Sequence, residues 1–264
     1  MSLEWTKTHE PPEIRLEDVA LGYGGQEVLR GITAVLPKGE ISVILGGSGG
    51  GKSTLLKSIM GLLSPSKGHI YLGDSDLYEL ENSEMRMIRK RMGVLFQDGA
   101  LLGSLPLGEN VALPLREHTG LDESLTETIV RMKLKLVGLE AFMDFFPNQL
   151  SGGMRKRAGL ARALAMDPRV LLCDEPTSGL DPITAADLDQ LILELKAAFG
   201  MTIVVVSHDL ESVFTIADHV VVLNKGIAVF QGIPKNLRLS QDPFLRQFLS
   251  RQPTRGGQGT PASA

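Results

Sequence analysis

The apolar positions fall into short β-type runs near the start of the chain and into longer helical spacings in its middle. Between residues 14 and 36 they predict strands at 14–19, 28–29 and 32–36, with turns at 22–25 and 37–39. A strand at 41–45 and a helix at 53–63 follow directly. Hairpins that lead into a strand and a helix indicate a small antiparallel layer beside a parallel α/β core.

From residue 98 to residue 163 the pattern changes to helical spacings with few β-branched runs. It predicts a short helix at 108–115 that Pro114 closes, an amphipathic helix at 123–137 and another helix after Gly152. This stretch is therefore predicted to be a helical insert between two parts of one core.

The core resumes at 170–173 with a continuous apolar run, which is typical of a central parallel strand. The remaining pattern predicts strands at 68–73, 92–96, 201–206, 219–224 and 226–231, and helices at 77–90, 185–199, 210–217 and 242–250. Residues 1–13 are predicted to be a loose lead-in, 14–252 one folded domain, and 253–264 a disordered tail.

Composition sets further bounds. The 264 residues are 43% apolar and 22% charged, as in an ordinary globular protein, and the net charge of −4 gives no basic field for nucleic acid. The single Cys173 excludes an internal disulfide. The start of the chain lacks the apolar segment of a signal peptide, and no apolar run approaches the roughly 18 to 20 residues that span a membrane. We therefore expect the protein in the cytoplasm.

A glycine-rich stretch matches the phosphate-loop pattern G-x-x-x-x-G-K-[ST] between a predicted strand and a predicted helix. Its residues are Gly46, Gly47, Ser48, Gly49, Gly50, Gly51, Lys52, Ser53 and Thr54. Glycines let backbone N–H groups approach phosphate oxygens, Lys52 would contact the β- and γ-phosphates, and Ser53 would offer a hydroxyl to Mg²⁺. A merely flexible loop is the alternative, but the flanking strand and helix favour a nucleoside triphosphate site.

Asp174 and Glu175 end the apolar run at 170–173. Two carboxylates at the end of a buried strand are costly unless a cation or base chemistry uses them. Asp174 would hold Mg²⁺, and Glu175 would orient and deprotonate an attacking water. In isolation the same pair also suits the start of a helix.

Ser151, Gly152 and Gly153 begin a basic helix. Ser151 is a natural N-cap and the glycines expose backbone donors, so this helix start is a second candidate anion site, although ordinary capped helices look the same. Each of two further features allows two interpretations. Tyr23 either stacks on a purine or packs across its hairpin. The basic residues 86–91 either contact anionic lipid or form a solvated helix end.

The order of these motifs resembles that of the ATP-binding-cassette (ABC) ATPases across about residues 14–235. The landmarks are the phosphate loop, Gln97 after a strand, Leu-Ser-Gly-Gly at 150–153, Asp174-Glu175, Ser-Gly-Leu-Asp at 178–181, and His208 after a β-rich run. The resemblance implies a P-loop NTPase fold of the α/β class. It has a RecA-like core, an antiparallel β-subdomain and an α-helical subdomain, here about 98–163.

The resemblance also implies roles for single residues. Tyr23 stacks on adenine, the loop 46–54 holds the phosphates of ATP, and Gln97 senses the γ-phosphate or Mg²⁺ as a catalytic and metal-site residue. Glu175 and His208 are catalytic, whereas Ser53 and Asp174 hold Mg²⁺. In a head-to-tail dimer, Ser151, Gly152 and Gly153 cap the ATP of the other copy, and Asp181 bridges the two copies.

Two positions depart from the family pattern. Gly47 stands where the loop usually has proline, and Met154 stands where Leu-Ser-Gly-Gly is usually followed by glutamine. We expect activity to survive, because the capping N–H groups come from the residues before Met154.

A narrower resemblance, to the ATPases of bacterial phospholipid transporters of the Mla type, lies in the stretches 89–97, 99–101, 110–119, 181–184 and 216–219. It implies an ATPase on the cytoplasmic face of the inner membrane. Its expected partners are a second copy, a transmembrane permease, an MCE-domain lipid-binding protein and a small cytoplasmic regulatory subunit. An ATPase of another importer, for amino acids or other small solutes, is the alternative. A non-transport regulatory ABC protein fits less well, since the chain has one cassette, a short insert and no basic face.

Overall fold

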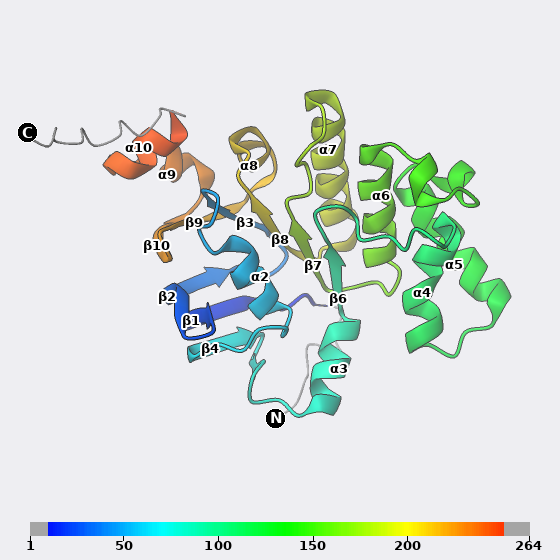
Figure 1. Cartoon of the computed structure of the whole chain (residues 1–264), viewed down its shortest axis with the longest axis horizontal. Helices are drawn as coiled ribbons and strands as arrows, with labels where there is room; N and C mark the ends of the chain where they lie inside the picture. Colours follow the sequence, from blue (N-terminus) through cyan, green and yellow to red (C-terminus); the bar gives the residue numbers. More distant parts are fainter. Residues whose placement is uncertain (1–9, 251–264) are drawn as a thin grey trace, which may run out of the picture.

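The computed structural model describes residues 10–250, which fold around two β-sheets. The predicted lead-in falls largely outside this range, and the predicted tail at 253–264 lies wholly outside it. Figure 1 shows the smaller sheet beside the larger one, with helices packed around the larger sheet. No helix among the described residues is long and apolar enough to cross a membrane.

The smaller sheet has four antiparallel strands in the order β2-β1-β4-β5. Its strands are β1 Ile14–Tyr23, β2 Gln26–Leu36, β4 Lys67–Leu72 and β5 Ser75–Asp76. The predicted break between 28–29 and 32–36 is wrong. Gly31, with φ +57, lies in a bulge where the register slips between the pairs Leu21–Leu29 and Val19–Ile32, so that β2 continues. The first turn is also shorter than predicted, because Tyr23 still pairs with Gln26.

The larger sheet has six strands in the order β10-β9-β3-β8-β7-β6, and only the β9–β10 pair is antiparallel. Its strands are β3 Ile41–Gly46, β6 Met92–Leu95, β7 Val170–Asp174, β8 Thr202–Ser207, β9 His219–Asn224 and β10 Ile227–Gly232. Every residue of β3 and β8 is buried, which explains why these strands read as continuous apolar runs.

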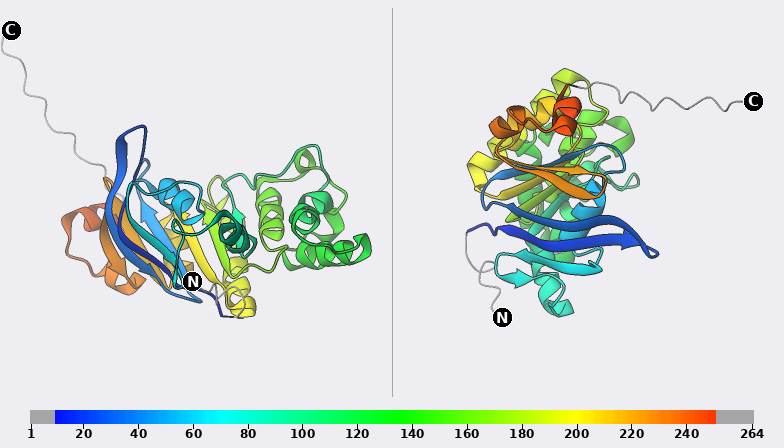
Figure 2. Two further views of the ribbon diagram at one scale, coloured as in Figure 1. Left: turned by 90° about the horizontal axis from the view of Figure 1, so that it is seen from below. Right: turned by 90° about the vertical axis from the view of Figure 1, so that its left-hand side faces the viewer.

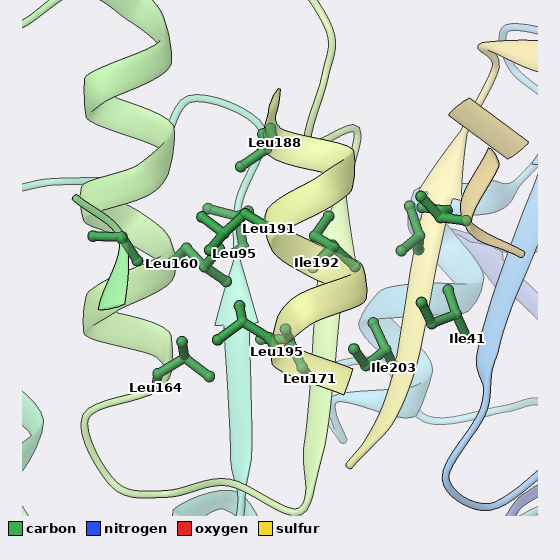
Figure 3. Packing of buried hydrophobic residues seen from close by; sticks show 14 of the residues in the cluster. Ile41, Leu95, Leu160, Leu164, Leu171, Leu188, Leu191, Ile192, Leu195 and Ile203 are labelled. Atoms are coloured by element: carbon green, nitrogen blue, oxygen red, sulfur yellow. The ribbon is translucent and has the colours of Figure 1, made fainter. Parts of the chain in front are cut away.

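Alternate residues of the central strands build two separate cores. On one face, Ile41 and Ile203 pack with α7 (Pro182–Phe199), as Figure 3 shows for Ile192 and Leu195. On the other face, Ile44 packs with α2 (Lys52–Ile59) and with strands of the smaller sheet. The parallel sheet is therefore covered on both faces, as a doubly covered α/β core requires.

The helical insert contains α4 Leu107–His118, α5 Glu123–Leu136 and α6 Gly152–Ala163, with two 3₁₀ turns at Glu140–Phe142 and Pro147–Gln149. Figures 1 and 2 place it at one side of the molecule, beyond β6, and place α9 (Pro234–Arg238) and α10 (Pro243–Leu249) at the opposite side. The prediction that Pro114 closes a helix is wrong. Proline has no N–H to donate to the carbonyl four residues earlier, so the helix loses one hydrogen bond at Pro114. Val111 and Leu115, on either side of it, are buried, and their packing keeps α4 helical as far as His118.

Several other helix ends differ from the prediction for local reasons. The helix α2 stops at Ile59 rather than 63, since Gly61 takes φ +71. The helix α3 (Asn82–Lys90) begins five residues later than predicted, at a capping box between Glu81 and Glu84. The helix α7 begins at Pro182 rather than 185, because Asp181 caps it. Finally, α8 is Leu210–Ile216, as predicted within a residue, whereas the short α9 was not predicted.

Candidate functional site

The carboxyl ends of four parallel strands bring the candidate residues together. In the register, Leu95 of β6 lies opposite Cys173 of β7, so that Gln97 and Glu175 each follow two residues later. Asp174 lies opposite Val206 of β8, and His208 follows two residues beyond it. Because β3 also runs parallel to β8, the glycine-rich loop leaves the sheet at the same edge. This is the edge at which open α/β sheets bind ligands.

The glycine-rich loop is shaped by two close approaches. Gly51 takes φ +90, and a Cβ there would lie 2.4 Å from Cδ2 of Leu29; at Gly46 it would lie 2.6 Å from the carbonyl oxygen of Leu223. Gly47 and Gly49, in contrast, would meet nothing within 4 Å, so this side of the loop is open. The loop therefore presses against the protein on one side and leaves backbone exposed on the other, as a phosphate cradle requires.

Lys52 carries its charge into this cradle. The residue is 8% exposed, and its Nζ donates to the carbonyl oxygens of Gly46 at 3.0 Å and Gly47 at 3.1 Å. Nζ also lies 3.7 Å from Oε1 of Glu175. The first turn of α2 has no side-chain cap, so its N–H groups are available to an anion. A buried ammonium beside uncapped N–H groups is a donor set that fits the phosphates of ATP.

Ser53 and Asp174 bring two oxygen ligands together, since Oγ of Ser53 donates to Oδ1 of Asp174 at 3.2 Å. Burial raises the pKa of the Asp174 carboxyl, and the hydrogen bond from Ser53 opposes that rise. A hydroxyl and a half-buried carboxylate are ligands of the hard type that Mg²⁺ prefers, so these residues fit Mg²⁺.

Glu175 lies between a cation and a histidine. Nδ1 of His208 is 2.7 Å from Oε2 of Glu175, while Lys52 lies near the other carboxylate oxygen. The backbone of Glu175 takes φ +49, a left-handed conformation that is strained for a residue with a side chain. Its N–H donates to the carbonyl of Val206 at 2.9 Å, which fixes the strained residue to β8. This strain lies at the residue to which the sequence assigns the base.

Lys156 of α6 also contacts Glu175, and the sequence analysis did not predict this contact. Its Nζ donates to the carbonyl oxygen of Glu175 at 3.1 Å and to Oγ of Ser178 at 3.3 Å, with only 5% of the residue exposed. Burial lowers the pKa of the Lys156 ammonium. The only sequence signal was its place in the basic run 155–157, which by itself does not distinguish a buried lysine from exposed ones.

Among residues 10–250, no side-chain hydrogen bond or ion pair joins the other predicted site residues to this cluster. Ser151 caps α6 by accepting from the N–H of Met154 at 3.3 Å, and Gly153 packs against Thr184 so closely that a Cβ would lie 2.5 Å from it. Gly152 begins the same helix. Asp181 caps α7, and the hydrogen bond from the Thr184 hydroxyl lowers its pKa.

Tyr23 and Gln97 are exposed. Tyr23 ends β1 with 49% of its surface accessible, and Gln97 follows β6. A cavity of about 1010 Å³ opens beside Glu175 and His208 and reaches Phe244 and Phe248 of α10.

Comparison with known proteins identifies this arrangement. Residues 29–178 match the family model described as ABC transporter. The chain belongs to the ABC transporter family. It is an ATP-binding cassette of the type that hydrolyses ATP, and its fold of two sheets with a helical insert is the cassette fold.

Two groups of relatives are similar over most of the chain. "Probable ribonucleotide transport ATP-binding protein mkl" of Mycobacterium tuberculosis is 46% identical over 90% of this chain, which spans 66% of that protein's length. "Intermembrane phospholipid transport system ATP-binding protein MlaF" of Escherichia coli K12 is 43% identical over 89% of this chain and 88% of that protein.

Solved cassettes share the fold. A dimeric ATP-binding cassette in a post-hydrolysis state, bound to ADP and Pi, is 32% identical with a TM-score of 0.76, covering 83% of this chain and 98% of that one. The cbiO1 protein of Clostridium perfringens, part of the ABC transporter complex cbiONQ, is 31% identical with a TM-score of 0.80, covering 90% and 95%.

Proposed function

We propose that this cassette hydrolyses ATP to drive phospholipid transport through a membrane permease. The observation that carries the hydrolysis is the contact of Glu175 with both His208 and Lys52 at the carboxyl edge of the parallel sheet. The lipid substrate is supported by the 43% identity to the phospholipid-transport protein, which extends along 88% of that protein's length.

Each residue of the cluster has one task in this proposal. Lys52 and the loop 46–54 hold the phosphates of ATP. Ser53 and Asp174, with Gln97, hold Mg²⁺, which when bound neutralises charge on the β- and γ-phosphates. Glu175 accepts a proton from the attacking water, and His208 keeps the Glu175 carboxylate in place and contacts the γ-phosphate.

The remaining residues act between two copies. The backbone N–H groups at the start of α6, from Ser151, Gly152 and Gly153, close on ATP held by the other copy, while Asp181 lies at the dimer contact. Tyr23 stacks on adenine. One solved cassette, similar to this chain at 32% and 33% identity in two structures, is dimeric, which supports this pairing.

The partners follow from the lipid substrate. They are a transmembrane permease, an MCE-domain lipid-binding protein and a small cytoplasmic regulatory subunit, with the cassette on the cytoplasmic face of the inner membrane.

Substitution of Glu175 by glutamine tests the hydrolysis. In Glu175→Gln we expect ATP binding to remain and turnover to fall at least about 100-fold, since a positioned base contributes about 10²–10⁴-fold. Glu194→Gln, on the exposed side of α7, is the matched control and should keep full activity. Lys52→Ala should instead lose ATP affinity. Full hydrolysis by Glu175→Gln would refute the assigned base.

Copurification tests the substrate. The cassette is expressed with its permease, and the bound material is identified by mass spectrometry. Phospholipid together with an MCE-domain protein would support the proposal. The alternative is an importer of a small solute, which the name of the mycobacterial relative illustrates with ribonucleotides. A soluble small-molecule receptor in place of lipid would favour that alternative while leaving the hydrolysis intact.

A further inference from the structure

A cluster of metal-ligating side chains lies on the smaller sheet, outside the ATP site. His69 lies on β4, Asp76 ends β5, and Glu79 follows in the next turn. One ligand atom from each lies within 4.8 Å of those from the other two. We propose that His69, Asp76 and Glu79 bind one divalent transition-metal ion of the zinc type.

The hairpin between β4 and β5 creates this cluster. Tyr71 pairs with Asp76 across the ladder, and His69 lies two residues before Tyr71 on the same face, so His69 and Asp76 are diagonal neighbours. Nδ1 of His69 lies 2.6 Å from Oδ2 of Asp76. The backbone N–H of Glu79 donates to the carbonyl of Asp76 at 3.3 Å. This turn brings Glu79 back beside His69 and Asp76.

Asp76 is the fixed ligand of the three. It is 3% exposed, and its Oδ1 accepts from the backbone N–H of Tyr78 at 3.0 Å, which leaves Oδ2 directed at His69. His69 and Glu79 are exposed. Tetrahedral zinc with bonds of about 2.0–2.2 Å needs ligand atoms about 3.4 Å apart. Nδ1 of His69, now 2.6 Å from Oδ2 of Asp76, would therefore have to move slightly outward to admit the ion, and Glu79 would have to move inward. Both side chains are exposed and can make these movements around the fixed carboxylate.

The charges around the cluster favour a dication. Glu17 is neutralised by Arg15, whose Nε lies 2.9 Å from its carboxylate. With Glu17 paired to Arg15, the ligands Asp76 and Glu79 supply two carboxylates, whose charge one M²⁺ ion balances once it takes the place of the proton on His69.

The ligand types decide the class of metal. An imidazole nitrogen with two carboxylate oxygens suits Zn²⁺, Ni²⁺ or Cu²⁺, whereas Mg²⁺ and Ca²⁺ prefer oxygen ligands alone. The site is also separate from Ser53 and Asp174, which belong to α2 and the larger sheet. Saturating Mg²⁺ can therefore occupy the ATP site without competing here.

The test is an isothermal calorimetric titration of the full, nucleotide-free chain with Zn²⁺ in the presence of saturating Mg²⁺. We expect one site in the wild type, and at least about tenfold weaker binding in His69→Gln and in Glu79→Gln, because even outer-shell losses weaken metal binding by 10–100-fold. His118→Gln, at the exposed end of α4, is the matched control and should bind as the wild type does.

A second readout identifies the ligand. With Cu²⁺ as the probe, electron paramagnetic resonance should show nitrogen hyperfine splitting from one imidazole in the wild type, and His69→Gln should lose it. Circular dichroism checks that the variants are folded. Equal Zn²⁺ affinity in the wild type, His69→Gln and Glu79→Gln would overturn the proposal, as would an equal loss in His118→Gln. Neither result would bear on ATP hydrolysis.

Discussion

Asp189 is a buried carboxyl whose ionisation opposes folding at neutral pH. It lies on α7 with 4% of its surface exposed, and Oγ of Ser212 on α8 donates to its Oδ1 at 2.8 Å. Burial raises the pKa of Asp189 from 3.8 to about 6; the bond from Ser212 opposes the rise and the charge of Asp209 adds to it. We expect Asp189→Asn, which keeps an oxygen to accept from Ser212, to be more stable than the wild type at neutral pH.

The sign and size of this change in unfolding free energy follow from the linkage between ionisation and folding. Because the pKa is higher in the folded state, the protonated Asp189 stabilises the fold fully below about pH 4, and this contribution is lost as the pH rises through about 6. The shift of about two pKa units corresponds to about 3 kcal/mol of unfolding free energy. Relative to the wild type, Asp189→Asn should gain about 1 kcal/mol at pH 4.5 and about 3 kcal/mol at pH 7.5.

Urea unfolding at several pH values between 4.5 and 7.5 measures this difference. Asp187→Asn is the matched control, because that carboxylate lies on the same helix with its side chain 62% exposed. Its curve should run parallel to that of the wild type. If Asp189→Asn also runs parallel to the wild type over this range, the reasoning about burial is refuted.

Three further predictions concern other buried groups. Cys173 is fully buried, and burial raises the pKa of its thiol to about 12, so Ellman's reagent at pH 8 should react with one thiol only after unfolding. Asn110, fully buried, makes four hydrogen bonds to the backbone of the preceding loop, so Asn110→Leu should lose about 2–4 kcal/mol in urea unfolding; an unchanged midpoint would contradict this. Gly51→Ala should lower the melting temperature of the nucleotide-free chain, because its Cβ would meet Leu29, whereas Gly47→Ala should leave it unchanged; equal melting temperatures would contradict the loop geometry.

The sequence predicted the parallel core well, because both faces of the sheet are covered. A strand buried on both faces reads as an unbroken apolar run, as at 202–207 in β8. The smaller sheet was harder to predict. The bulge at Gly31 looked like a break between two strands, since a period-2 pattern cannot show where the partner strand slips.

The candidate site was predictable where chemistry is carried by residue type and order, and not where it depends on packing. The contact between Glu175 and His208 joins residues 33 positions apart, and only the parallel register brings them together. No motif in the sequence indicates that Lys156 belongs to this site. Its role depends on the place where α6 meets the loop after β7, which no pattern along the chain specifies.

Lys156 connects the helical insert to Glu175 through a hydrogen bond. The same helix, α6, begins with the Ser151 cap and carries Lys156 about one turn later, where Nζ donates to the carbonyl of Glu175. That carbonyl belongs to a residue with φ +49, whose conformation costs about 1–3 kcal/mol and persists only while its neighbours hold it. The N–H of Glu175 donates to the carbonyl of Val206. Its carbonyl accepts from Lys156 and also from the N–H and the hydroxyl of Ser178, so the core, the loop after β7 and the helical insert together hold the strained residue. One of the three hydrogen bonds to the carbonyl of the base thus comes from the insert, so a movement of α6 away from the core would remove it.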